Sequence, residues 1–178
     1  MTSKRIVSES FEGEVLIGKQ YQEYVFEDCD FVDTTIRNSN FSLVQFIRCR
    51  LINLSFVDSK VQGVNFMANN PTIPPSLSFV STDLSRSSLA HCSLRKSKLT
   101  ECKAIETDFF CADLRNCDCR GTDFSGAILS EASLVGADFR HSINYSINPF
   151  QNPQKLRKAR FSSNEVINLL SELDIDIE

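Results

Sequence analysis

The stretch CADLRNCDCRGTDFSGAILSEASLVGADFRH, residues 111–141, carries a large apolar residue at nearly every fifth position. Stepping by five from Phe79 to Phe139 meets Leu or Phe at eleven of thirteen positions. These two residue types supply only 30 of the 178 residues of the chain, so the spacing is a repeat. The same step from Phe26 to Phe66 meets a large apolar residue at all nine positions.

The residue two positions before each large one is mostly small in the later repeats, from 77 to 137. The residue between the small and the large one is often Asp or Asn. A helix cannot keep this pattern on one face, because five residues turn it by about 500°. A long strand cannot either, because an odd period reverses its faces at every repeat. Short extended pieces that alternate with bends fit the pattern, and they predict an all-β fold that winds as a β-solenoid.

The units ADLRN (112–116), TDFSG (122–126) and ADFRH (137–141) resemble the repeat of the pentapeptide-repeat family. The resemblance covers roughly residues 21–147. It implies a right-handed quadrilateral β-helix with four repeats, hence twenty residues, in each coil.

With coils of this length, residues twenty apart stack along the axis. Phe26, Phe46 and Phe66 are then expected to form one inward ladder. The undersized Ala104 and Cys119 each fall between two large residues, as dense packing of the interior requires.

An interruption lies between Phe66 and Phe79, where twelve residues shift the repeat by three positions. Its prolines remove backbone donors, so we expect a loop at 67–78 that projects from the solenoid. The loop is either a partner-binding element or an insertion without function. The candidate partner-binding residues are Asn69, Asn70, Pro71, Ile73, Pro74 and Pro75.

The two ends of the chain are expected to cap the solenoid. Residues 1–20 keep the large positions but not the small ones, which predicts a degenerate capping coil. Residues 148–178 predict a linker, a short α-helix over 161–173 that begins with a capping box at Ser162 and Glu165, and an alternating tail. The helix either covers the open end or forms a homodimer, through Val166, Leu169, Leu170, Leu173 and Ile175.

The charge of the chain is mildly acidic, with 19 basic and 23 acidic residues, so nothing indicates direct binding of nucleic acid. Several aspartates occupy outward positions of the later repeats. They are expected either to form an acidic face or, as Asp commonly does, to cap the bends. These aspartates are Asp108, Asp113, Asp118, Asp123 and Asp138.

The sequence contains no pattern that indicates an enzyme. Five of the seven cysteines fall at inward small positions and one at an inward large position, where a thiol acts as a small apolar group. No zinc spacing, phosphate loop or nucleophile motif occurs, so we expect no catalytic residue, metal or cofactor. We find no stretch typical of a secretory signal or membrane span and expect a cytoplasmic protein.

The layout of the C-terminal segment is similar to that of Qnr-type proteins, a topoisomerase-protecting group within the family. This resemblance implies a non-catalytic protein that acts as a DNA mimic, binds DNA gyrase or topoisomerase IV and gives resistance to quinolones or toxins. The alternative is an interaction scaffold, such as an effector or adaptor, for a partner other than a topoisomerase.

Overall fold

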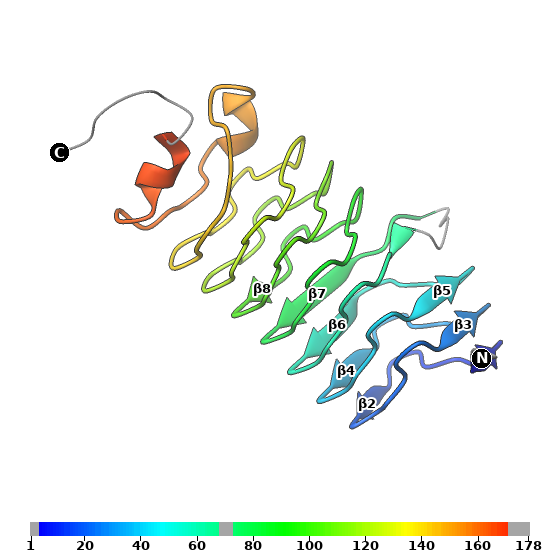
Figure 1. Ribbon diagram of the computed structural model, residues 1–178. Coiled ribbons are helices and arrows are strands. Elements are labelled where there is room, and N and C mark those ends of the chain that lie inside the picture. Colours follow the sequence, from blue (N-terminus) through cyan, green and yellow to red (C-terminus); the bar gives the residue numbers. More distant parts are fainter. Residues whose placement is uncertain (1–3, 68–72, 171–178) are drawn as a thin grey trace.

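The computed structural model describes residues 4–67 and 73–170, and in it the chain winds repeatedly around one axis (Figure 1). On one side, β1 (Arg5–Val7), β3 (Val25–Glu27) and β5 (Gln45–Ile47) form a parallel sheet. Ile6 pairs with Phe26 and Phe26 with Phe46, so equivalent residues are twenty apart. We refer to this side as the β1 side.

A second side carries a longer parallel sheet, which we call the β2 side. Its strands are β2 (Val15–Ile17), β4 (Thr35–Arg37), β6 (Leu54–Val57), β7 (Leu77–Val80) and β8 (Leu99–Thr100). Isolated parallel bridges join the coils on the other two sides, for example Asp30 with Arg50 and Gln20 with Asn40. The chain is therefore an all-β solenoid, as the five-residue period predicts.

The interior is filled by the large residue of each repeat. Phe26, Phe46 and Phe66 stack with ring centroids 5.8 and 5.9 Å apart, which confirms the expected ladder. Ala104 and Cys119 are fully buried in the same core, at the places where the sequence predicts small residues between large ones.

The inward small positions are often hydroxyls, and these are satisfied by the neighbouring coil. Thr34 donates to the carbonyl of Phe11 at 2.8 Å, and Thr122 donates to that of Leu99 at 2.6 Å. Ser142 does the same with Cys119 at 2.6 Å. Among the described residues no buried side-chain nitrogen or oxygen lacks a partner, so this polar ladder costs the core little.

Each corner places the second residue after the large one in the left-handed region. Gly121 has a φ of 71°, but most corners carry other residues, such as Asp28 at 54° and Leu43 at 58°. Asp tolerates this region, whereas a leucine there is strained. The stacking of the coils therefore imposes the bend even where the residue does not favour it.

The interruption adds three residues to one coil without disturbing the core. Leu54 pairs with Leu77 and Phe56 with Phe79, twenty-three apart instead of twenty. The rings of Phe56 and Phe79 still stack at 5.6 Å with an interplanar angle of 7°. Strand β7 begins at Leu77, inside the predicted 67–78 loop.

The α-helix expected over 161–173 is wrong for the part that the structure describes. Two 3-10 helices follow the last coil, η2 (Pro153–Leu156) and η3 (Val166–Leu170), and residues 4–67 and 73–170 contain no α-helix. The predicted capping box does not form: the Glu165 N–H donates to the Ser162 carbonyl at 3.2 Å, and the Ser162 hydroxyl accepts from the His141 backbone N–H at 2.8 Å. No helix in this described part is long and apolar enough to cross a membrane.

Replacing Phe46 by Ala tests the ladder. Phe46 is buried between Phe26 and Phe66, so we expect Phe46→Ala to lower the free energy of unfolding by about 3–5 kcal/mol. Ile128→Ala, at a half-exposed position, is the control and should cost about 0.5 kcal/mol or less. Urea unfolding followed by circular dichroism measures both, and equal losses would contradict an inward Phe46.

Candidate protein-binding surfaces

The interruption offers the first candidate surface. Asn69, Asn70 and Pro71 lie outside the described residues. Of the remaining candidates, Ile73 and Pro74 are exposed, with 63% of Ile73 accessible, whereas Pro75 is buried. A buried proline beside an exposed isoleucine anchors the end of the segment and presents an apolar side chain to solvent.

The five candidate aspartates do not share one side of the solenoid. Asp118 and Asp138 pair with each other above β8, on the β2 side. The other three aspartates lie on three different sides: Asp108 pairs with Ser88, Asp113 with Ser93 and Asp123 with Lys103 in the neighbouring coil. A step of five residues moves the chain by one side, so the structure brings only Asp118 and Asp138 together and forms no single acidic face.

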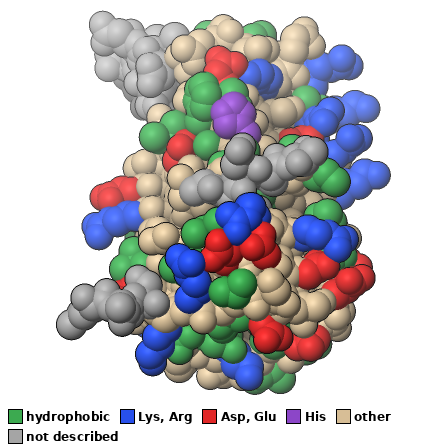
Figure 2. Space-filling model, turned by 90° about the vertical axis from the view of Figure 1, so that its right-hand side faces the viewer, with side chains coloured by type: hydrophobic (Ala, Val, Ile, Leu, Met, Phe, Trp, Pro, Cys, Tyr) green, Lys and Arg blue, Asp and Glu red, His purple; other side chains and the backbone are tan. Residues whose placement is uncertain are grey.

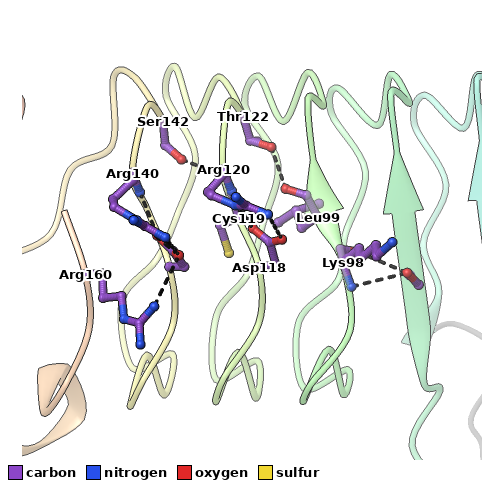
Figure 3. A network of polar contacts seen from close by, with 11 residues as sticks. Lys98, Leu99, Asp118, Cys119, Arg120, Thr122, Arg140, Ser142 and Arg160 are labelled. Carbon is purple, nitrogen blue, oxygen red and sulfur yellow. Dashed lines mark hydrogen bonds and ion pairs between the residues drawn. The ribbon is translucent and has the colours of Figure 1, made fainter. Parts of the chain in front are cut away.

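Arginines neutralise three of these aspartates from two residues further along the chain. Arg120 donates to both carboxylate oxygens of Asp118 at 2.8 and 2.7 Å (Figure 3). Arg140 donates to Asp138 in the same way, at a closest distance of 2.7 Å. The guanidinium hydrogen bonds hold the pKa of each of these two carboxyls below its usual value. The pairs present balanced charge instead of a row of bare anions. Arg115 binds Asp113 in the same way, at 2.6 Å, and the pKa of Asp113 is lowered too.

The other two aspartates serve the bends. Asp123 accepts from the Ser125 backbone N–H at 3.0 Å and from the Asn144 amide at 2.9 Å. Burial raises the pKa of Asp123, but its hydrogen bonds outweigh burial and the net shift is downward. Asp108 accepts from the Phe110 N–H at 2.9 Å. These contacts favour the role of turn caps, and Figure 2 shows acidic and basic side chains interspersed on the face it presents.

The C-terminal cap is the third candidate surface. Phe161 stacks on Phe139 at 5.5 Å, and the Tyr145 hydroxyl donates to the Glu165 carbonyl at 2.8 Å, so this segment covers the end of the core. Burial raises the pKa of Tyr145 to about 12. Of the predicted residues, Val166 is 42% exposed and Leu169 packs partly against the core. The Leu170 side chain, Leu173 and Ile175 lie outside the described part.

Sequence reasoning missed one group of side chains on the β2 side. Arg37, the last residue of β4, lines the same groove as three cations about sixty residues further along the chain, namely Arg95, Lys96 and Lys98. Writing the sequence in rows of twenty, with three residues removed between Phe66 and Phe79, would have placed them together.

The described residues show no assembled metal site. No group of three or more His, Cys, Asp or Glu within residues 4–67 and 73–170 is arranged to hold a metal ion. Burial raises the pKa of the Cys92 and Cys102 thiols to about 12 and that of Cys49 to about 11. These buried thiols stay protonated at neutral pH and are poor nucleophiles.

Comparison with known proteins supports the fold. The model of the family "Pentapeptide repeats" matches residues 29–66, 78–110 and 107–143, in eight copies. A trypsin-treated form of QnrB1, described as a plasmid-mediated fluoroquinolone resistance protein, has a TM-score of 0.69 and 17% identity, covering 99% of this chain and 100% of that chain. Full-length QnrB1 has a TM-score of 0.55 and 17% identity, covering 97% of this chain and 98% of that chain. No curated protein matches the chain in sequence.

Thiol labelling tests the environment of the cysteines. Six of the seven cysteines are buried and only Cys111 is partly exposed, so we expect one thiol to react quickly with a disulfide reagent at about pH 8. The others should react only on unfolding. Cys111→Ser should remove the fast phase, and two or more fast thiols in the folded chain would contradict the described core.

Proposed function

The chain belongs to the pentapeptide-repeat family, and from this premise we propose that it is a non-catalytic, right-handed quadrilateral β-solenoid that binds DNA gyrase or topoisomerase IV. Such binding confers resistance to quinolones or to gyrase-directed toxins. The observation that carries the proposal is the likeness in shape to QnrB1, which extends over nearly all of both chains.

In this proposal the parts of the chain have distinct roles. Residues 21–147 form the rod that enters the enzyme, residues 1–20 cap one end, and residues 148–178 cap the other and join two chains. The interruption contacts the topoisomerase, and its exposed Ile73 offers this contact an apolar side chain.

A second candidate function is an interaction scaffold in the cytoplasm, an effector or adaptor for a partner other than a topoisomerase. The distribution of charge favours it. A mimic of duplex DNA presents closely spaced anions, about one per 1.7 Å. Here arginines neutralise Asp113, Asp118 and Asp138, and the five aspartates occupy four sides.

A supercoiling assay separates the two functions. We expect micromolar protein to restore supercoiling by gyrase in the presence of a quinolone. Ile73→Ser should weaken this protection several-fold, because it removes the exposed apolar contact of the interruption. Ile17→Ser is the matched control, since Ile17 is exposed to the same degree, 61% against 63%, but lies on β2. It should leave protection unchanged.

Two results would decide against the topoisomerase. One is the absence of protection at micromolar protein. The other is recovery from lysate of a different partner, whose binding is lost when residues 69–76 are deleted; this would establish the scaffold.

Light scattering tests the proposed homodimer. We expect the wild type to be a dimer and Leu170→Glu to be a monomer, because a charge in the C-terminal segment opposes burial against a second chain. Val15→Glu, at an exposed position of β2 near the opposite end of the solenoid (Figure 1), should stay dimeric. A monomeric wild type would reduce the C-terminal segment to a lid.

A further inference from the structure

A shallow groove of about 480 Å³ lies across the β2 side, over β4, β6 and β7. Its middle contains Val57 and Val80, which pair with each other and are half-buried. Arg37 lies at the β4 end of the groove, and Arg95, Lys96 and Lys98 lie at the opposite end. The sheet that forms the groove runs along one edge of the solenoid in Figure 1.

These four cations differ from most arginines of the chain. Arg48, Arg50 and Arg86 each hold a carboxylate within 2.8 Å, as do Arg115, Arg120 and Arg140 on the later coils. No described carboxylate lies within 4.0 Å of Arg37, Arg95, Lys96 or Lys98, and all four are exposed. Four cations without an acidic neighbour at ion-pair distance therefore surround one groove on a chain whose net charge is −4.

The rest of the lining is mostly polar. Ser55 and Ser93 contribute hydroxyls, whereas the donors of four other lining residues are already bonded within the protein, namely those of Asn53, Ser76, Ser78 and Ser97. None of the lining residues is acidic. Asp113 and Asp118 stack on Ser93 and Lys98 in the next coil, but Arg115 and Arg120 hold them. Cations, hydroxyls and an apolar floor fit a ligand that has both carboxylates and aliphatic groups.

The dimensions favour a short peptide over a nucleic acid. From β4 to β8 there are three strand spacings, about 14 Å, which an extended segment of about four or five residues covers. Asp58 and Glu101, at exposed corners beside β6 and β8, would repel a phosphate chain that continued past the groove. A duplex carries about one charge per 1.7 Å, far more than four cations match.

We propose that this groove, defined by Arg37, Arg95, Lys96 and Lys98 around Val57 and Val80, docks a short extended segment of a protein partner with the pattern acidic-x-aliphatic-x-acidic, in which every second side chain faces the groove. The acidic side chains pair with the cations at both ends, and the aliphatic one covers the valines. The inference deepens the proposed function, because it rests on the chain having a protein partner and names the chemistry recognised.

Fluorescence anisotropy with the labelled heptapeptide Ser-Glu-Ser-Val-Ser-Glu-Ser, whose second, fourth and sixth side chains share one face when extended, tests the groove on the full chain. We expect saturable binding that weakens with salt, and a loss of about tenfold or more in Arg95→Glu/Lys98→Glu. The control is Lys60→Glu/Lys103→Glu, which changes the net charge equally at two exposed cations on a neighbouring side. It should lose less than about twofold, and circular dichroism checks that both variants fold.

The outcomes are decisive in either direction. Absence of binding by the wild type, equal loss in the two variants, or tighter binding of a single-stranded oligonucleotide of equal charge would each overturn the proposal. Residues 173–178 read Leu-Asp-Ile-Asp-Ile-Glu, so a chain ending at Leu170 is assayed in parallel. Tighter binding by the shortened chain would assign the groove to this tail instead. The supercoiling result does not affect this measurement, so failure of either proposal is recognised separately.

Discussion

Hydrogen bonds between successive coils are the constraint on which the rest of the structure depends. The backbone N–H of Phe11 donates to the backbone carbonyl of Asp30 at 2.8 Å, and the N–H of Asp30 donates to the carbonyl of Glu9 at 2.9 Å. The same pattern recurs along the solenoid. These bonds fix each residue directly above the one twenty positions earlier, or twenty-three positions earlier across the interruption. The number of a residue then determines both its side of the solenoid and whether it points inward.

The identity of the inward-pointing residues could be predicted from the sequence, because it depends only on the five-residue period. Phe26, Phe46 and Phe66 stack as expected, and no knowledge of partners or surfaces is required. The C-terminal segment cannot be predicted in the same way, and the α-helix expected there is wrong for the described residues. The capping signal is local, whereas in the structure the Ser162 hydroxyl accepts a long-range hydrogen bond from the His141 backbone N–H.

The outward half needs the coil length as well as the period. Aspartates five apart look like one row in sequence, but a quarter turn separates them, and only Asp118 and Asp138 stack. Conversely, residues far apart in sequence can lie on the same side. Arg37 and Lys98 line one groove although three coils and a register shift of three residues separate them. Arginines such as Arg120 also lie two residues after three of the five aspartates, so the charge of a side cannot be read from its acidic residues alone.

The interruption shows how such a fold can acquire a binding surface without loss of its core. Phe56 and Phe79 stack across the added residues as closely as Phe26 and Phe46 do in an uninterrupted coil, 5.6 against 5.8 Å. The added residues therefore leave the stacking on either side of them unchanged. Ser76 links the two candidate surfaces, because it follows the buried Pro75 and donates to the Asn53 side chain in the groove at 3.3 Å. A partner that contacts Ile73 and the groove together would bury one continuous area instead of two small ones, which is what specific association requires.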